Sequence, residues 1–481
     1  MVPGGAVDDN DIVANELRNE GAGVPVSNAS LQDILDRVGY VDSHAVADRA
    51  TSFWNSAPMQ AKAMVLPESA DDIAGVLRHC NASGQSVITH GGLTNCVAAV
   101  EPGLDDLVLS TEKMHDIVEI DTVGGTAVVE AGAILQNVQE TVASEGMYFP
   151  LDLGARGSCT IGGNIATNAG GINVLRYGMM RNLVLGLEVV LADGTVMSSM
   201  NRMLKNNAGY DMKQLFIGSE GTLGVVTRAV LRLFPQPASR QDALVAISSM
   251  EGVIDFLGML QRDLAGNLSA FEIMWGNYYR AVTGENGHRP PLPREHPFYV
   301  VFQAAGSDPD GDAARFERVL GKALDAGHIA DAVIPKSAAE TRAIWEIREN
   351  FEPALVSPTF YLYDVSLPIR DMDAYVAAVE ANVANRWPDG MCIALGHMAD
   401  GNLHFFVAPG EPGDLHKASD ECVYGPLKQY GGSVSAEHGI GLEKISWLPH
   451  SKSSDEIRLM RALKDSLDPN NVLNPGRVLG S

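Results

Sequence analysis

The sequence predicts an α+β protein with two large domains. The chain has 481 residues, of which 46% are hydrophobic, so it is long enough for two to four domains with buried cores. Strand-like segments alternate with segments of helical spacing on both sides of Pro235-Gln236-Pro237, which favours an α+β class. The pattern changes character at this proline pair, and we place the domain boundary near residue 236.

The first half is predicted to begin with two amphipathic helices and to continue in strands. Ser30 and Ser69 each precede a helical repeat of apolar residues, as helix-capping residues do. A strand at 86–89 leads into His90-Gly91-Gly92, and further strands are predicted within 107–133 and at 185–191 and 223–234.

The second half is predicted to mix strands at 298–303 and 361–367 with helices at 313–324 and 372–384. A last helix is expected at 455–467, followed by a turn-rich stretch. We therefore expect an N-terminal helical segment (1–49), a first domain (50–235), a second domain (236–450) and a tail (451–481) that packs back on the first domain.

Charge and cysteine content exclude several classes of function. The chain has 35 Lys and Arg against 60 Asp and Glu, a net charge of −25, which disfavours nucleic acids and anionic membranes as partners. Its five cysteines are scattered without a CxxC pair, which is typical of reduced thiols. No targeting segment or membrane-spanning apolar run is visible, so we expect a cytoplasmic protein.

Two glycine-rich segments, 90–95 and 157–171, predict a cofactor site. Glycines let backbone amides approach a ligand closely, and runs of such amides bind diphosphate oxygens without a P-loop lysine. Neither GxxxxGKS nor GxGxxG is present. Ordinary turns are the alternative, but several separated Gly/Ser/Thr/Asn loops in one half favour a nucleotide cofactor over turns.

The glycine-rich half resembles a known flavoprotein family. Residues 150–178, 186–194 (GLEVVLADG), 206–211 (NNAGYD) and 215–227 (LFIGSEGTLGVVT) are similar to the FAD-binding domain of the FAD-dependent D-2-hydroxyacid dehydrogenases. This family lies within the vanillyl-alcohol-oxidase superfamily, and the resemblance runs from about residue 55 to the C-terminus. It implies an FAD domain of that superfamily's type and an α+β substrate domain with an antiparallel sheet.

The resemblance also implies which residues bind FAD. A first loop would hold the diphosphate, a second region the ribityl chain and ring, and a third the adenine end. In that order the residues are Gly91, Gly92, Thr94 and Asn95; Pro150, Gly154, Ser158, Thr160, Gly163, Asn164 and Thr167; and Glu220, Gly224 and Val226, with Asn474 added from the tail. Relatives with covalent FAD carry their histidine after the Gly-Gly pair, whereas His90 precedes it, so we expect non-covalent FAD.

A histidine pair predicts a metal site in the second half. If Asp400-Gly401 is a two-residue hairpin loop, His397 and His404 are directly opposite each other, with Cβ atoms ~5 Å apart. Glu437 completes an open site for zinc, with manganese or iron(II) as alternatives. A solvated hairpin with two facing histidines is the bland alternative. The family's GHxxDGNLH and EHGIG motifs agree with the metal.

The residue after Glu437 has a different predicted role. Oxidation of a 2-hydroxy acid needs a base for the hydroxyl proton while the Cα hydrogen leaves as hydride to flavin N5, and the resemblance gives His438 this role. Its alternatives are a fourth metal ligand or a core histidine. Arg348 matches the family's substrate-carboxylate arginine; otherwise it forms a surface ion pair, for example with Glu352. Asn402 is placed with the substrate residues.

Departures from the family predict the substrate class. Leu362 and Phe406 stand where D-2-hydroxyglutarate dehydrogenases carry Lys and Asn, and Glu352 replaces a neutral hydroxyl residue. We therefore expect a monocarboxylic D-2-hydroxy acid with an apolar side chain, D-lactate or larger. One alternative is that Leu362 and Phe406 are core residues and that selectivity lies elsewhere, for example at Met274-Trp275. Another is that the substrate is D-2-hydroxyglutarate. Outside this class of enzyme, the alternative is a metal-dependent hydrolase.

The electron acceptor and the oligomeric state are not encoded in any motif of the sequence. The family's usual soluble acceptor is electron-transfer flavoprotein, and a quinone or a cytochrome is the alternative. A homodimer is left open. The hydrolase alternative leaves the glycine-rich half unexplained, and no HExxH motif is present.

Overall fold

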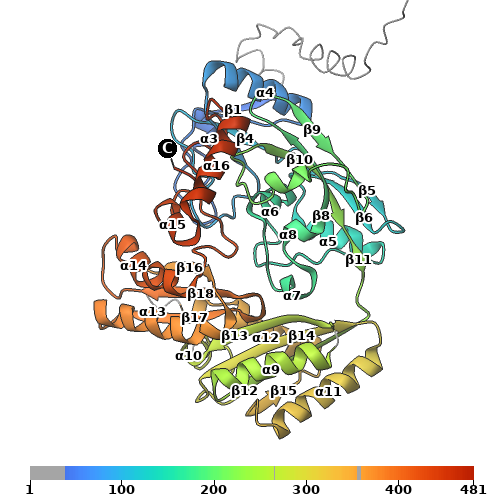
Figure 1. Cartoon of the computed structure of the whole chain (residues 1–481), viewed down its shortest axis with the longest axis vertical. Coiled ribbons are helices and arrows are strands. Elements are labelled where there is room, and N and C mark those ends of the chain that lie inside the picture. The colour runs from blue at the N-terminus through green and yellow to red at the C-terminus, as the bar shows by residue number, and fades with distance from the viewer. Residues whose placement is uncertain (1–37, 265, 286, 355–358, 481) are drawn as a thin grey trace, which may run out of the picture.

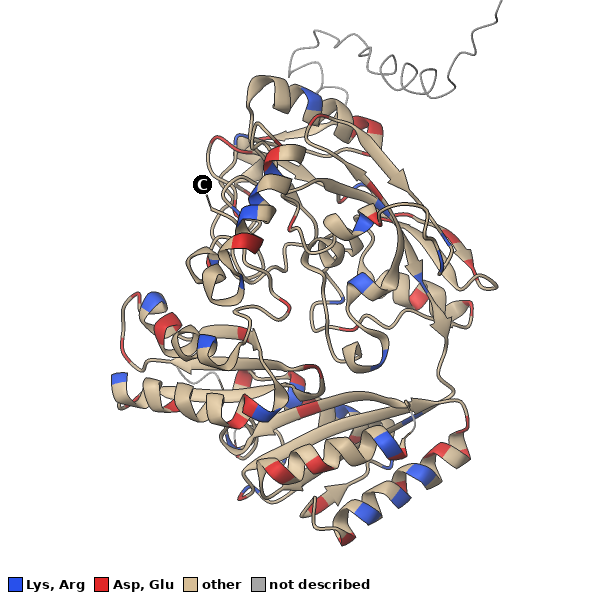
Figure 2. Ribbon diagram, viewed as in Figure 1, with Lys and Arg blue, Asp and Glu red and all other residues tan. Residues whose placement is uncertain are grey.

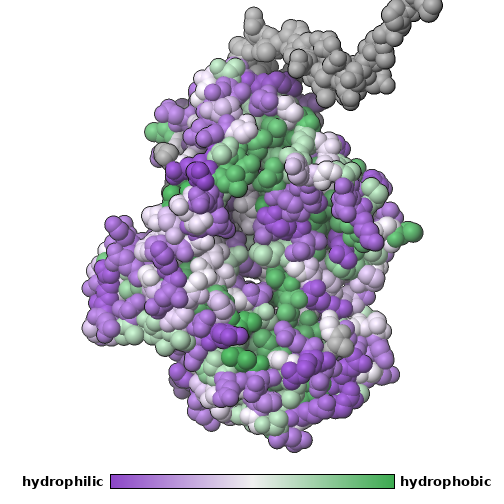
Figure 3. Space-filling view, in the orientation of Figure 1, coloured by the Kyte–Doolittle hydropathy of each residue, from purple (hydrophilic) through white to green (hydrophobic). Residues whose placement is uncertain are grey.

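The computed structural model describes residues 38–264, 266–285, 287–354 and 359–480. The predicted helix that begins at Ser30 lies outside the described residues, apart from its end at Val38. The chain forms two halves, stacked along the long axis of the molecule (Figure 1). The space-filling view shows a hollow where the two halves meet (Figure 3).

The first half contains two sheets and one short strand pair. One sheet has the order β1-β2-β4-β3, with β1 antiparallel to β2 and the other pairs parallel. The other sheet is antiparallel with the order β5-β6-β10-β8-β9. Their strands are β1 (Tyr40–Asp42), β2 (Ala63–Val65), β3 (Val87–His90), β4 (Leu107–Ser110), β5 (Ile117–Asp121), β6 (Thr126–Glu130), β8 (Val184–Val190), β9 (Val196–Ser199) and β10 (Val225–Arg232), and the short pair is β7 (Met147–Tyr148) with β11 (Phe234–Pro235).

The helices of the first half are mostly short. Ser69 caps α4 by accepting a hydrogen bond from the amide of Asp72, and the apolar face of α4 packs on the first sheet. Thr160 caps α6 in the same way, through the amide of Gly163. The helices are α3 (Ser43–Val46), α4 (Ala70–Ser83), α5 (Leu135–Ser144), α6 (Ile161–Thr167), α7 (Val174–Tyr177) and α8 (Met180–Leu183), with the 3-10 turn η1 (Met212–Leu215).

The second half is built on one seven-stranded antiparallel sheet with the order β15-β12-β14-β13-β17-β18-β16. The chain passes from β11 into this sheet across residues 236–238, at the proline pair. The strands are β12 (Ser239–Ile247), β13 (Leu268–Trp275), β14 (Phe298–Gly306), β15 (Asp331–Val333), β16 (Tyr361–Ser366), β17 (Met391–His397) and β18 (Asn402–Ala408).

Helices cover both faces of this sheet, and the two faces differ. The larger core lies under α9 (Met250–Asp263), α11 (Pro309–Asp325), α13 (Met372–Arg386) and α14 (His416–Leu427). The opposite face carries a smaller core under α10 (Gly276–Val282) and α12 (Ala338–Glu349). Because side chains alternate along a strand, every second residue of β17 and β18 points to this smaller core and its surroundings. The remaining 3-10 turns are η2 (Glu352–Ala354), η3 (Ile369–Asp371), η4 (Met398–Asp400), η5 (Lys428–Tyr430) and η6 (Ile445–Trp447).

The tail returns to the first half through α15 (Leu448–Ser451) and α16 (Ser454–Leu467), as Figure 1 shows. Leu473 forms a parallel bridge with Val87 of β3. The ammonium group of Lys464 donates hydrogen bonds to the carbonyls of Thr222 (2.9 Å) and Leu473 (2.8 Å). The last residues therefore belong to the first half in space, although the second half precedes them in sequence.

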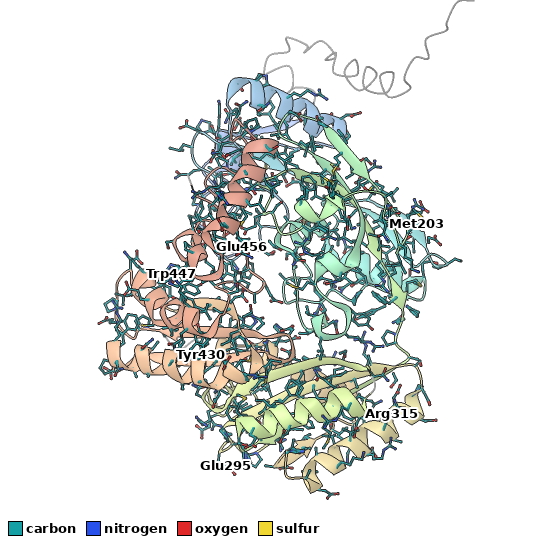
Figure 4. The ribbon with its side chains drawn as sticks, in the orientation of Figure 1. Met203, Glu295, Arg315, Tyr430, Trp447 and Glu456 are labelled. Carbon is teal, nitrogen blue, oxygen red and sulfur yellow. The ribbon has the colours of Figure 1, made fainter. Side chains whose placement is uncertain are left out.

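Two aromatic residues that precede the tail pack within the second half. Trp447 donates a hydrogen bond from its indole nitrogen to Asp420 of α14, and Tyr430 packs edge-on against Tyr375 of α13 (Figure 4). Acidic side chains are spread over both halves, in keeping with the net charge (Figure 2). None of the helices within the described ranges combines the length and the apolar character needed to cross a bilayer.

Candidate active site

A cavity of about 890 Å³ lies between the two halves. Most of its wall comes from the glycine-rich loops of the first half, and the rest comes from the end of α12 and the segment at Glu437-His438. Fourteen of the fifteen residues predicted to bind FAD line it: Gly91, Gly92, Thr94, Asn95, Gly154, Ser158, Thr160, Gly163, Asn164, Thr167, Glu220, Gly224, Val226 and Asn474. The fifteenth, Pro150, is buried and does not line the cavity, and its carbonyl accepts a hydrogen bond from Asn173.

The glycines of the first loop are required by close backbone packing. A Cβ atom at Gly92 would overlap the carbonyl oxygen of Ser158, and one at Gly91 would press on the hydroxyl of Thr160. The two glycine-rich segments therefore lie backbone against backbone, which brings their amides together at one end of the cavity.

The polar groups of the wall fit a flavin nucleotide. Among the residues that line the cavity, three have a buried atom without a hydrogen-bond partner in the described chain: Thr89 Oγ1, His90 Nδ1 and Asn164 Nδ2. Buried polar groups are normally paired, so these atoms indicate a polar ligand. No lysine or arginine of the described residues lines the cavity, so its diphosphate would be held by amides and neutral side chains.

His90 has a role in the wall that the sequence did not reveal. It ends β3, and its Nε2 lies 2.8 Å from the carbonyl oxygen of Val100, so Nε2 carries the proton. Burial lowers the pKa of His90 to about 4, which keeps the ring neutral. The free Nδ1 is therefore an acceptor for a ligand hydroxyl or amide. The only signal for this role was the position of His90 directly before Gly91.

The histidine pair comes together, but not in the predicted register. The hairpin between β17 and β18 has a longer connection, Met398–Gly401, and His404 is opposite Leu395 instead of His397. The prediction of a two-residue loop was therefore wrong by two positions. A shift of two keeps both histidines on the same face, because side chains alternate with period two. Their ring centroids are 5.3 Å apart.

Glu437 reaches the same point from a different segment. One nitrogen each of His397 and His404 and one carboxylate oxygen of Glu437 lie within 4.8 Å of one another. The amide of Gly171, in the first half, donates a 2.6 Å hydrogen bond to Glu437 Oε1. Two imidazoles and a carboxylate at this separation form a donor set that suits zinc, manganese or iron(II).

A buried glutamate behind the histidine pair supports it. Glu272 of β13 is opposite His397 in the sheet, and its Oε1 lies 2.8 Å from His397 Nδ1. Burial opposes the charge of His397, but the carboxylate outweighs it and raises the pKa of His397 to about 9. The Nδ1–H donates to Glu272 and leaves Nε2 for a metal, an arrangement that metal-binding histidines commonly use. No sequence pattern pointed to Glu272, because it lies 125 residues from His397 along the chain.

Arg348 lies beside the same glutamate, with Nη2 3.0 Å from Glu272 Oε2. It is not the surface ion pair with Glu352, because its side chain is only 10% exposed. Its Nη2 is taken up by this ion pair, whereas its Nε has no hydrogen-bond partner among the described residues. Buried guanidinium donors without an acceptor indicate an anionic ligand, so a substrate carboxylate fits here.

Asp364 of β16 organises the segment that carries Glu437 and His438. Its Oδ2 accepts hydrogen bonds from the amides of Ala436 (3.0 Å), Glu437 (2.8 Å) and His438 (2.9 Å). Burial alone would raise the pKa of Asp364, but the nearby His438 and Lys444 and the amides hold it well below its usual range. Sequence reasoning noticed Asp364 only as a landmark in its strand.

Asn402 supports Asp364 and does not reach the cavity. It is buried, and its amide nitrogen donates to Asp364 Oδ1 (2.8 Å) and to the carbonyl of Val365 (3.0 Å). The structure thus places Asn402 beside Asp364 and not in the cavity lining. His404, by contrast, lies at the polar end of this face. Burial lowers its pKa well below the ordinary value, so it is a neutral imidazole and a suitable metal ligand.

His438 lies at the boundary between the cavity and the predicted metal ligands. It lines the cavity, and its ring centroid is 6.1 Å from that of His404. One nitrogen each of His404 and His438 and an oxygen of Asp364 also lie within 4.8 Å of one another. Asp364 Oδ2 is already occupied by amides, so this second group is a poorer metal site than the first.

The residues predicted to select the substrate lie behind the cavity wall. Leu362 and Phe406 are opposite each other in the sheet, and Phe406 is 4% exposed within the smaller core. Neither side chain lines the cavity, so neither is placed to touch a substrate bound there directly. Phe351, whose ring is 4.7 Å from that of Phe406, lies in front and lines the cavity. The alternative pair, Met274-Trp275, is also buried in the cores.

Comparisons with protein-family models agree with the two halves. Residues 61–199 match the model described as "FAD binding domain", and residues 236–478 match the model described as "FAD linked oxidases, C-terminal domain". The chain therefore has the fold of the FAD-linked oxidases.

The relatives found by sequence are dehydrogenases of D-2-hydroxy acids. The D-2-hydroxyglutarate dehydrogenase of Bos taurus is 39% identical over 87% of this chain and 77% of its own. The enzyme of the same name from Xanthomonas citri pv. viticola is 37% identical over 89% and 90%. A protein named a putative mitochondrial D-lactate dehydrogenase in Schizosaccharomyces pombe is 36% identical over 85% and 80%.

The structural neighbours are more distant. The structure of p-cresol methylhydroxylase with bound substrate superposes with a TM-score of 0.75, covering 96% of this chain and 98% of that one at 16% identity. The 4-ethylphenol oxidase of Gulosibacter chungangensis gives a TM-score of 0.70 at 17% identity, covering 95% and 98%. At this identity they show the shared fold alone.

Proposed function

Because this chain belongs to the FAD-dependent D-2-hydroxyacid dehydrogenases, we propose that it oxidises a monocarboxylic D-2-hydroxy acid with an apolar side chain. The chain is an FAD-dependent oxidoreductase that acts on the CH–OH group of its substrate. The observation that carries the proposal is the buried guanidinium of Arg348, which pairs with Glu272 and keeps an unpaired Nε donor, next to the His397, His404 and Glu437 group.

The chemistry divides between the bound groups and the side chains. FAD held by the glycine-rich loops would supply the acceptor for the hydride of the substrate Cα. A divalent metal held by His397, His404 and Glu437 would act as a Lewis acid for the substrate hydroxyl. Arg348 binds and orients the substrate carboxylate through its free donors. His438 takes the hydroxyl proton, so one proton and one hydride leave and the 2-oxo acid remains.

The charge of the cavity supports a substrate with a single carboxylate. Glu346 and Glu349 of α12 and Glu352 of η2 line it, and no described lysine or arginine does; Arg348, which lies outside this lining beside Glu272, is assigned to the first carboxylate, so no lining cation is left for a second. A distal carboxylate would meet like charges and lose water without gaining a partner. Phe351, backed by Phe406, offers apolar surface worth about 0.8 kcal/mol for each CH₂ that it buries.

We predict that flavin reduction prefers D-lactate and longer apolar D-2-hydroxy acids to D-2-hydroxyglutarate. The measurement is kcat/KM for each acid and for its L enantiomer, with the bleaching of the flavin absorbance as the signal. The reason is the acidic, cation-free lining described above. A preference for D-2-hydroxyglutarate, the substrate in the names of several relatives, would show that the substrate class is wrong while the reaction type stands.

We further predict that His397→Ala and Glu437→Ala remove the metal. Each substitution deletes one of three ligands, and a site with two remaining ligands binds a divalent ion far more weakly. The measurement is metal content per chain after gel filtration, by elemental analysis. His416→Ala is the control, because His416 lies on α14 outside the predicted triad. Full occupancy in either ligand variant contradicts the triad.

The electron acceptor remains a proposal from family membership. Electron-transfer flavoprotein is the acceptor we propose first, and a quinone or cytochrome is the alternative. Each is tested by whether it reoxidises the substrate-reduced enzyme.

A further inference from the structure

Glu220 joins the two halves at the segment that carries His438. Its side chain belongs to the first half and is 7% exposed. Its Oε1 accepts a hydrogen bond from the amide of Ile440 (2.7 Å), and its Oε2 accepts one from the amide of Gly441 (2.8 Å). Both carboxylate oxygens are therefore occupied by the segment that follows His438, and the side chain has little capacity left for the adenine end of FAD, to which the resemblance assigned it.

The backbone of Glu220 is itself fixed in an uncommon conformation. Its φ is +52°, in the left-handed region that residues other than glycine rarely adopt. The side-chain Nδ2 of Asn474, from the tail, donates a 2.7 Å hydrogen bond to the main-chain carbonyl of Glu220. This contact holds the main chain so that the carboxylate points to residues 440–441. A strained residue held by its surroundings is often part of a functional arrangement.

The segment 436–441 is held from both halves. Asp364 of the second half accepts from the amides of residues 436–438, and Glu220 of the first half accepts from those of 440 and 441. Asn95 of the first half also donates to the carbonyl of His438 (3.2 Å). His438 is therefore held by two buried carboxylates: Asp364 binds the main-chain amides up to His438, and Glu220 binds those that follow it.

We infer that Glu220 is a positioning residue for His438, which it holds at the cavity by binding the amides of Ile440 and Gly441. The segment contains Gly439 (φ +87°) and Gly441 (φ +52°), so it would have many conformations if it were not anchored. A misplacement of about 1 Å in a reacting group can reduce a rate by about 10²-fold. This inference rests on the proposed function only in taking His438 as the proton acceptor.

The test is Glu220→Gln. Glutamine keeps one acceptor oxygen but turns an NH₂ group toward one of the two amides, so one anchor is lost. We expect FAD and metal content to be unchanged, kcat for flavin reduction to fall about tenfold or more, and KM to change less than about twofold. Amide hydrogen exchange in residues 436–441 is expected to become faster, which is a readout that does not depend on activity.

The matched control is Glu188→Gln. Glu188 is also a buried glutamate of the first half, but its carboxylate binds Thr227 and Arg228 in the sheet and does not contact residues 436–441. We expect this variant to lower the unfolding temperature without changing kcat or amide exchange in 436–441. A general loss of stability in the first half is thereby separated from a loss of positioning.

The other results are equally decisive. If Glu220→Gln loses FAD, then Glu220 binds the nucleotide and the inference is overturned. The inference is also overturned if kcat and amide exchange in residues 436–441 are both unchanged. If this variant does not fold, Glu220→Asp, which keeps both oxygens on a shorter side chain, must show faster exchange in 436–441, and unchanged exchange there overturns the inference. If no D-2-hydroxy acid reduces the wild-type flavin, the proposed function fails, while the exchange measurement still tests the anchor.

Discussion

Replacing His438 with alanine is expected to slow flavin reduction by about 10²–10⁴-fold while FAD and metal remain bound. The substitution removes the proton acceptor, but the three predicted metal ligands and the cavity wall stay in place. The measurement is the rate of flavin bleaching by substrate in single-turnover experiments, with FAD and metal content determined on the same sample.

The hydrogen bonds of the His438 main chain are expected to keep the segment in place when its side chain is removed. Asp364 and Asn95 bind its main-chain amide and carbonyl, so removing the imidazole does not release the segment. His115→Ala is the control, since His115 has a side chain that is 62% exposed. If His438→Ala loses metal as His397→Ala does, then His438 is a ligand and the base must be sought elsewhere.

Replacing Arg348 with methionine is expected to lower kcat/KM by about 10- to 150-fold, the equivalent of the 1.5–3 kcal/mol of a charge-assisted hydrogen bond. Methionine has a similar length but no charge, so the substrate carboxylate loses its partner. Glu272 also loses its ion pair and keeps only His397, and a buried charge with fewer partners costs up to about 3–5 kcal/mol of stability. We therefore expect a lower unfolding temperature as well as weaker catalysis.

Two further variants separate these effects. Arg342→Met removes an exposed arginine from the same helix, and it should change neither kcat/KM nor stability appreciably. Arg348→Lys keeps the charge that faces Glu272 but loses the planar fork, so stability should recover more than kcat/KM. An Arg348→Met enzyme with unchanged kcat/KM would show that Arg348 serves only Glu272.

Local sequence patterns predicted element types and the two glycine-rich segments, and the family resemblance supplied the individual residues of the cavity wall. The cap at Ser69, the period of α4, and the proline pair near 236 each predicted a feature that the structure contains. The glycine-rich loops could be assigned because their chemistry is local: a loop that must bring its amides together is glycine-rich wherever it lies. Pro150 does not line the cavity, because a motif match gives positions along the chain and not which side chains face the cavity.

The register of the hairpin between β17 and β18 could not be predicted from the local sequence pattern. Asp400-Gly401 is a strong two-residue turn signal, yet η4 lengthens the connection and moves His404 from opposite His397 to opposite Leu395. The two histidines still lie on one face because a shift of two positions preserves the face of a strand, and the metal itself stays a prediction. A shift of one would have separated the two histidines, and nothing in the local sequence excluded it.

The sequence by itself determined the fold class, the glycine-rich cofactor loops and the pairing of His397, His404 and Glu437. Only the tertiary structure decided how these groups are held. Glu272, Asp364 and Glu220 each lie 70 residues or more from at least one group that they bind, and in the sequence they are ordinary acids of strands and turns. Their function depends on burial and on the donors that meet them, and both arise only when the sheet and the two halves are assembled.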